Sequence, residues 1–263
     1  MFGTWRAAIP WKRGLILLWS FVSIAGCAVN EPDLQAAQKC LDSHQWEKAI
    51  EHLDEAIRES PSSAKAHVLR GMAELKLGHF AKSITDLERG RELGDSAEGD
   101  LLLAEAYLAR GDHQLAETTA SAGDGQQPAM LVLRGRARLA QSKFSQALDD
   151  FQRAIQLDPQ NSEALLYLGA VLIERDDFAQ AEECLTRSIS VQPSNPKAFW
   201  LRAIARENLH RSEVAESDRA TARELDPSFK FAESAMGQNL LRTVTEDKNA
   251  LLPIDSLNPR GRP

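Results

Sequence analysis

Carboxylates and histidines are the side chains of this sequence that could support acid–base or metal chemistry. Two pairs of neighbouring aspartates stand out, Asp149-Asp150 and Asp176-Asp177. General acid–base catalysis needs two such groups at one site. These pairs fall in separate helix and turn stretches, so we expect them to be solvated. Four of the six histidines fall at or beside predicted turns, where solvation is again expected: His44, His79, His113 and His210.

Sequence motifs of the common enzyme classes are absent from the chain. There is no phosphate-binding loop ending in Gly-Lys-Ser/Thr, no Gly-x-Ser-x-Gly elbow, no paired-cysteine metal spacing and no His-Glu-x-x-His. We therefore expect no catalytic residue, no metal and no cofactor, and we predict that the protein is not an enzyme.

Cys27 is the residue with the clearest chemical context. Lys12 and Arg13 precede an apolar run of twelve residues, Leu15 to Gly26. A membrane-spanning helix needs about 20 apolar residues, so this run is too short to span and indicates a secretory signal peptide. The run ends in Ile24-Ala25-Gly26-Cys27. This ending resembles the bacterial lipoprotein signal, in which an aliphatic and two small residues precede the cysteine that is diacylated and becomes the N-terminus.

That resemblance implies removal of residues 1–26 and two acyl chains at Cys27, enough for stable anchoring of an exported protein in a membrane. Residue 28 is alanine rather than aspartate. By resemblance to enterobacterial sorting rules, this favours the outer membrane where the cell has one. An ordinary signal peptide with a chance cysteine is one alternative, and a cytoplasmic protein with a misplaced start is another. Cys40 and Cys184 are expected to be small, buried or half-buried thiols rather than a disulfide.

The charge of the chain bears on the class of partner. The net charge is −7, and all three basic residues before Cys27 lie in the predicted signal peptide. The remainder has 28 basic and 38 acidic residues, a net charge of −10. Phosphate binding needs clustered Lys and Arg, so we expect no nucleic-acid partner.

Beyond residue 30 the sequence repeats one pattern six times. In one copy, Ala147 is followed by an aromatic residue at Phe151, by Ala154 and then by Pro159. The leading small residue recurs every 31 to 34 positions: Ala49, Ser83, Ala116, Ala147, Ala181 and Ala215. A second small residue lies upstream of each: Ala37, Gly71, Ala104, Gly135, Gly169 and Ala203. Small residues at both places allow two helices to pack closely.

This pattern resembles the tetratricopeptide repeat, a helix-turn-helix unit of 34 residues with small residues where the helices cross. The resemblance implies an all-α fold, a right-handed superhelical solenoid of six repeats. We place the repeats at residues 30–63, 64–96, 97–127, 128–161, 162–195 and 196–229. The third is three residues short, which marks either a hinge or a tolerated deletion. Residues 230–242 are expected to form a capping helix and residues 243–263 a mobile tail.

In this family the first helix of each repeat lines a concave face, where a protein or peptide partner binds. The position two residues before the crossing residue lies about 200° around the helix, opposite the contact within the repeat. Those positions are all apolar from the second repeat onward: Leu69, Leu102, Leu133, Tyr167 and Leu201. Further predicted groove residues are Met72, Glu105, Arg136, Lys197 and Ile204. These two rows of side chains either form an exposed apolar strip that binds a peptide or pack between neighbouring repeats.

The sequence thus predicts a lipid-anchored scaffold or adaptor that binds proteins in the bacterial cell envelope. Families of similar architecture include pilot lipoproteins for secretin assembly and adaptors of peptidoglycan hydrolases. A regulatory subunit of a separate envelope enzyme, a hydrolase or a glycosyl-transfer enzyme, is the alternative. Too few residues follow residue 229 for a catalytic domain. The segment Leu251–Leu257 is apolar enough to dock in the protein's own groove or on a partner, with simple disorder as the third interpretation.

Overall fold

Twelve α-helices form the part of the chain that the computed structural model describes, residues 31–94, 97–122 and 126–227. The first helices of six hairpins are α1 (Glu31–Asp42), α3 (Ala64–Lys76), α5 (Ala97–Arg110), α7 (Pro128–Ala140), α9 (Ser162–Glu174) and α11 (Pro196–Asn208). The second helices are α2 (Trp46–Glu59), α4 (Phe80–Glu92), α6 (His113–Ser121), α8 (Phe144–Leu157), α10 (Phe178–Val191) and α12 (Ser212–Leu225). The predicted all-α solenoid is confirmed.

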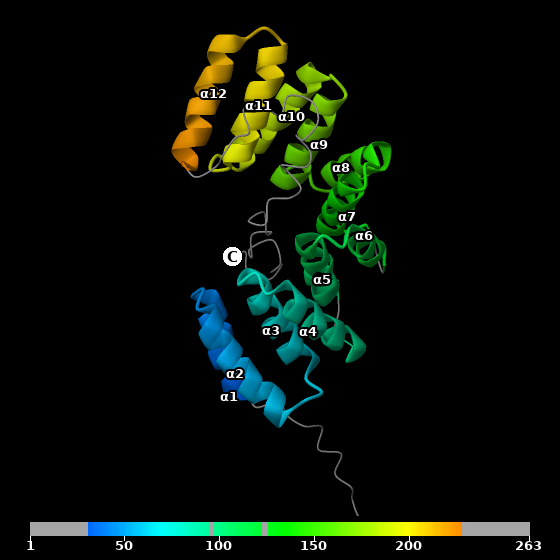
Figure 1. Cartoon of the computed structure of the whole chain (residues 1–263), viewed down its shortest axis with the longest axis vertical. Coiled ribbons are helices and arrows are strands. Elements are labelled where there is room, and N and C mark those ends of the chain that lie inside the picture. Colours follow the sequence, from blue (N-terminus) through cyan, green and yellow to red (C-terminus); the bar gives the residue numbers. More distant parts are fainter. Residues whose placement is uncertain (1–30, 95–96, 123–125, 228–263) are drawn as a thin grey trace, which may run out of the picture.

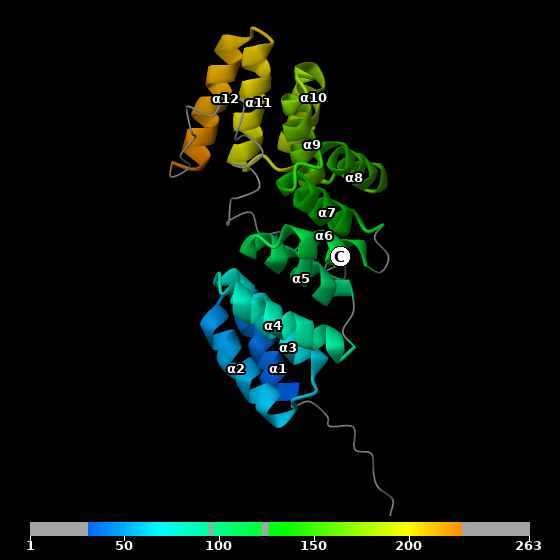
Figure 2. The same cartoon turned by 45° about the vertical axis from the view of Figure 1, so that its right-hand side comes forward.

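The hairpins stack one on the next into a long arc (Figures 1 and 2). In Figure 1 the first helices α3 and α5 lie on the inner side of the arc, and α4 and α6 lie on its outer side. The predicted signal peptide, Cys27, the capping helix at 230–242 and the tail at 243–263 fall outside the described residues. Among the described helices, none has the length and apolar character that crossing a membrane requires.

Each hairpin turns at the same place, seven residues after the crossing residue of its first helix. The residue there adopts a left-handed backbone conformation in all six hairpins: His44, Gly78, Gly111, Ser142, Asp176 and His210. Their φ angles lie between 56° and 94°. Glycine adopts this conformation at no steric cost, and the four other side chains carry a local strain. The turn positions expected for His44 and His210 are therefore confirmed.

The two helices of a hairpin approach so closely that the crossing position tolerates little side chain. A Cβ atom added to Gly135 would lie 2.6 Å from Cε1 of Phe151, which is fully buried. The same atom at Gly169 would lie 2.6 Å from Cγ of Leu185. The small residues that define the sequence pattern are therefore required by the packing of each hairpin.

Helix ends follow the signals that the sequence carries. The Asn195 side chain accepts a hydrogen bond from the backbone N–H of Lys197 at 3.1 Å, and Pro196 occupies the first turn of α11. Asn161 caps α9 in a related way, with a 2.8 Å bond from the N–H of Ala164. These caps satisfy backbone donors that a helix start otherwise leaves exposed.

The third hairpin departs from the others in its second helix. Helix α6 has 9 residues, whereas the other second helices have 13 or 14. Its small inward side chains, Ala116 and Ala120, are fully buried. Most buried apolar side chains of the described residues fall in two clusters, one from α1 to α7 and one from α7 to α11. Helix α7 contributes to both clusters.

Candidate partner-binding surface

The five apolar positions predicted to form an open strip lie on α3, α5, α7, α9 and α11. Four of them are closed to solvent, with exposed fractions of 0 or 1%: Leu102, Leu133, Tyr167 and Leu201. Leu69 on α3 is half-buried and packs against the first cluster. The expectation of an exposed apolar strip is therefore wrong for α5, α7, α9 and α11. Packing, which the sequence left as the alternative, accounts for these side chains because all four belong to the core clusters.

The second predicted row mixes apolar and charged side chains. Met72, Glu105 and Arg136 are buried, with exposed fractions of 7%, 1% and 6%. Ile204 and Lys197 on α11 are half-buried. Buried charges are costly unless they are paired, so the surroundings of Glu105 and Arg136 decide what this surface can do.

Arg136 is held by a neighbouring first helix. Its Nη1 lies 3.1 Å from Oε1 of Glu163, in the first turn of α9. Its guanidinium lies 5.5 Å from the centre of the Tyr167 ring, and that ring stacks on Phe151 at 5.6 Å. Arg136 was predicted to line the groove, whereas the structure pairs it with Glu163 of the same chain. Glu163 was missed, although an acidic residue in the first turn of a helix is a recognisable signal.

Charged residues on neighbouring first helices shift the pKa values of one another. Burial raises the pKa of Glu163; Arg136 and Lys197 counter this, and Glu105 adds to it. Burial lowers the pKa of Lys76 at the end of α3, and Glu105 opposes that shift. We call the five residues the concave charge ladder: Lys76, Glu105, Arg136, Glu163 and Lys197. Their charges alternate in sign from α3 to α11.

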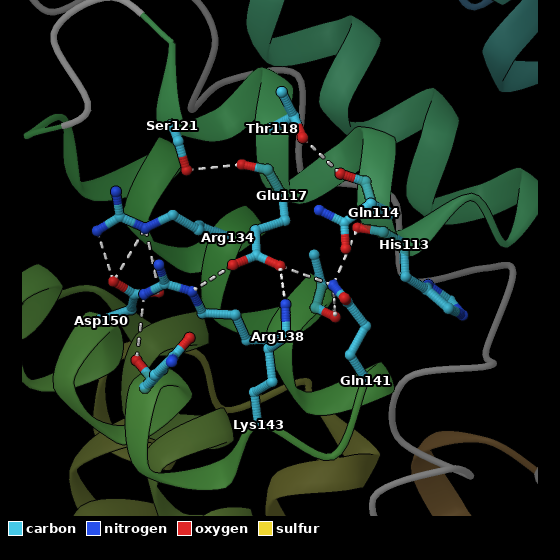
Figure 3. A network of polar contacts seen from close by, with 12 residues as sticks. His113, Gln114, Glu117, Thr118, Ser121, Arg134, Arg138, Gln141, Lys143 and Asp150 are labelled. Carbon is cyan, nitrogen blue, oxygen red and sulfur yellow. Dashed lines mark hydrogen bonds and ion pairs between the residues drawn. The ribbon is translucent and has the colours of Figure 1, made fainter.

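A second polar cluster lies between α6, α7 and α8 (Figure 3). The Glu117 carboxylate accepts hydrogen bonds from Nε of Arg138 at 3.0 Å, Nε2 of Gln141 at 2.9 Å and Nζ of Lys143 at 2.7 Å. Burial alone would raise the pKa of Glu117, but these donors outweigh it and lower the pKa to about 2. The carboxylate therefore stays ionised at neutral pH and ties the third hairpin to the fourth.

Asp150 completes this cluster and corrects one expectation. It is 3% exposed, not solvated, and it accepts bonds from Nη2 of Arg134 and Nη1 of Arg138, each at 2.6 Å. Asp149 is exposed as expected. Asp150 is thus a structural ion-pair partner rather than one half of an acid–base pair.

The same arrangement recurs between α10, α11 and α12. Glu182 accepts from Nε of Arg206 at 2.8 Å and from Nη1 of Arg211 at 2.6 Å. Asp218 accepts from Nη2 of Arg202 at 2.7 Å and from Nη1 of Arg206 at 2.8 Å. Two repeats, 68 residues, separate the arginines and aspartates of the two clusters. The two networks were not predicted, although this spacing is visible in the sequence and could have indicated them.

A buried histidine and two free cysteines are further side chains that could support chemistry. His67 is buried, and its ring nitrogens lie 3.3 Å from Oδ1 of Asp86 and 3.2 Å from the Pro61 carbonyl. Cys40 and Cys184 are half-buried free thiols, as predicted. Within residues 31–94, 97–122 and 126–227, no group of three or more His, Cys, Asp or Glu side chains is arranged to hold a metal ion.

Comparison with protein families assigns the class of protein. Two tetratricopeptide repeat models match the chain, one over residues 138–204 and the other over residues 34–94 and 69–129. Together they cover more than half of the sequence. The chain therefore belongs to the tetratricopeptide repeat family, whose members are typically scaffolds for protein–protein interaction. Among curated protein sequences, none matches this chain.

Solved structures of similar shape support the fold. PilW, described as a widely conserved type IV pilus biogenesis factor, has a TM-score of 0.67 at 15% identity over 82% of this chain and 98% of its own. Pseudomonas aeruginosa PilF has a TM-score of 0.65 at 16% identity, over 75% and 92%. The Cut9–Hcn1 complex of APC/C has a TM-score of 0.69 at 13% identity, over 84% and 43%. At these identities the likeness establishes a shared fold.

Proposed function

We propose that this protein is a lipid-anchored scaffold of the bacterial cell envelope that binds an extended protein segment along its concave charge ladder. It acts by holding partners together and not by catalysis. The family membership supports a role in protein–protein interaction. The envelope location is inferred from the signal sequence that ends at Cys27.

The alternation of charge along the ladder is the observation that carries the binding proposal. Glu105 and Arg136 are buried, so the partly exposed Lys76, Glu163 and Lys197 are the members that can reach a partner, and they favour one whose charges are complementary to theirs. The ladder ends on α11 beside Trp200 and Ile204, which are both half-buried and apolar. Aromatic and aliphatic side chains next to ion-pairing groups are typical of peptide-binding surfaces.

The lipid anchor sets where the scaffold works. Two acyl chains on Cys27 would hold the solenoid at a membrane surface, and Ala28 favours the outer membrane where the cell has one. Replacing Cys27 by alanine should abolish incorporation of radiolabelled palmitate and release the protein from the membrane fraction. Continued labelling of the Cys27→Ala protein would contradict the anchor.

Pilus biogenesis is the first process in which to seek the partner. The likeness to PilW extends over nearly the whole of that chain, and PilW is described as a type IV pilus biogenesis factor. Loss of surface pili on deletion of this protein would support the assignment. Normal piliation would direct the search to other envelope assemblies, such as a separate envelope enzyme that the scaffold regulates.

The ladder is tested by capture of partners from cross-linked envelope with two matched variants. Lys197→Glu reverses a half-buried charge on α11, and Arg153→Glu reverses an exposed charge on the second helix α8. We expect Lys197→Glu to lower recovery of the partner about tenfold, as loss of a desolvated charge pair does. The Arg153→Glu protein should recover it normally, with both variants keeping the wild-type circular dichroism. Equal recovery of the partner by the two variants would show that the ladder is not part of the binding site.

A further inference from the structure

Buried aspartates occupy the same place in the second helices of the second, fourth and sixth hairpins. They are Asp86 on α4, Asp150 on α8 and Asp218 on α12, each three residues after the leading small residue of its helix. Their exposed fractions are 7%, 3% and 4%. A buried carboxylate has to be paired to remain ionised, so the donors around each aspartate determine how its hairpin responds to pH.

Two arginines hold the aspartate of the fourth hairpin, and two hold that of the sixth. Each carboxylate accepts bonds of 2.6–2.8 Å from two arginines of its first helix: Arg134 and Arg138 at Asp150, Arg202 and Arg206 at Asp218. Arginine is not deprotonated in proteins. These pairs therefore do not change across the pH range in which histidine takes up or releases its proton.

The second hairpin keeps one of the two arginines. Arg70 donates to Asp86 from Nε at 2.8 Å and from Nη2 at 2.6 Å. Glu74 occupies the position of the second arginine, and an ionised carboxylate cannot donate. His67, one turn before Arg70, supplies the other contact, with its Nδ1 3.3 Å from Oδ1 of Asp86. A titratable side chain thus stands where the other two hairpins use a permanent cation.

Both ring nitrogens of His67 face hydrogen-bond acceptors. Nδ1 faces the Asp86 carboxylate, and Nε2 lies 3.2 Å from the carbonyl oxygen of Pro61, in the connection between α2 and α3. A neutral imidazole carries a proton on one nitrogen, so it donates one of these bonds and turns a lone pair toward the other acceptor. The imidazolium donates both. Because His67 is 7% exposed, water is a poor substitute for the missing bond.

The fixed charges around His67 also favour the protonated ring. Asp86 of α4 faces the ring directly, Arg70 lies on the same helix as His67, and Asp54 of α2 pairs with Arg70 at 2.6 Å. These three groups sum to one negative charge, which a proton on His67 neutralises. Within the described residues, α5 adds no ion pair or hydrogen bond to the ring. The group joins α2, α3 and α4, which pack side by side (Figures 1 and 2).

We propose that His67 forms a proton-dependent link between the first two hairpins. The protonated ring joins the connection at Pro61 to α4 through Asp86, and loss of the proton breaks one of these two bonds. A folded state that binds this proton more tightly than the unfolded chain gains stability as the pH falls. The gain is complete below the ordinary titration range of histidine and is lost as the pH rises past neutrality. The first hairpin is then held to the second more firmly in acid.

Nitrogen NMR of the imidazole rings in the purified full chain reads the protonation state directly. An unperturbed histidine is mostly neutral at pH 7, whereas we expect both His67 nitrogens to show the chemical shifts of an imidazolium in most molecules. The Asp86→Asn protein is the control, and its His67 ring should be mostly neutral at this pH. A wild-type His67 with a single protonated nitrogen at pH 7 would overturn the inference.

Hydrogen exchange measures the consequence for the joint. His67→Gln keeps a polar side chain and takes up no proton. Amides in residues 46–94 should exchange faster in this variant than in wild type, by a factor about five times larger at pH 6 than at pH 8. Comparing the two proteins at one pH cancels the intrinsic pH dependence of exchange. Amides of α8 and α12 are the internal reference and should show the same factor at both pH values.

The Asp86→Asn background separates the proton-dependent link from a purely structural role. With the carboxylate removed, His67→Gln should change exchange by the same factor at pH 6 and pH 8. Equal factors in the wild-type background, or a pH-dependent factor that persists with Asp86→Asn, would overturn the link. If either variant does not fold, the ring NMR of the wild-type chain decides the question.

Discussion

Replacement of Glu117 by glutamine is expected to weaken the joint between the third and fourth hairpins in a pH-dependent way. The variant keeps the size of the side chain and removes the charge that Arg138 and Lys143 share. The pKa of Glu117 is lowered from 4.5 to about 2 in the folded protein. At about 1.4 kcal/mol per pKa unit, the whole shift corresponds to roughly 3 kcal/mol of folding free energy. The Lys143 side chain is 36% exposed, so solvent screening reduces this to about 1.5 kcal/mol.

The sign of the pH effect follows from the depressed pKa. Glu117 stabilises the folded state fully above its unfolded pKa near 4.5, and this contribution is lost as the pH falls toward 2. Wild type should therefore be more stable than Glu117→Gln by about 1.5 kcal/mol at pH 7, with less than half of that difference left at pH 3.

Urea unfolding followed by circular dichroism at pH 7 and pH 3 measures both differences. Glu183→Gln, an exposed carboxylate on α10, is the matched control and should change the free energy of unfolding by less than about 0.5 kcal/mol. A Glu117→Gln effect as small as that of the control, or one that stays constant between pH 7 and pH 3, would refute the reasoning.

Four further substitutions test the packing. Gly135→Ala should destabilise the fold by about 1–3 kcal/mol in urea unfolding, because the added Cβ meets the Phe151 ring. Asp150→Asn should cost about 3 kcal/mol by the same measurement, and Asp149→Asn almost nothing, since only Asp150 is buried between arginines. Tyr167→Ala should cost about 3–5 kcal/mol, a loss that an exposed binding residue would not show. Equal effects for the two aspartates, or a Tyr167→Ala protein of wild-type stability, would contradict the assignments.

The helical hairpins could be predicted from the sequence because their determinants are local. A small residue at Gly135, a second at Ala147 and a stop at Pro159 define one hairpin; the small residues recur in all six hairpins and the proline in most of them. Asn195 followed by Pro196 is another local signal, and it marks the start of α11. Such signals act over one or two turns of helix, within the range that periodicity reports.

The surface was predicted less well because burial depends on neighbouring hairpins. Helical geometry places Leu133 and Tyr167 away from their own second helix, but it does not report what lies across from them, and both belong to the core. Asp150 seemed solvated because its arginine partners are 12 and 16 residues away. Glu163 pairs with Arg136 across 27 residues, beyond the reach of one repeat's pattern.

Site-specific photo-crosslinking in living cells tests the central claim most directly. The probe is placed at Ile204 on the inner side of α11 and, for comparison, at Arg153 on the second helix α8. A concave binding site predicts an adduct with a second protein from position 204, at much higher yield than from position 153. Adducts that form only from position 153, or equally from both, would contradict a partner site along the concave charge ladder.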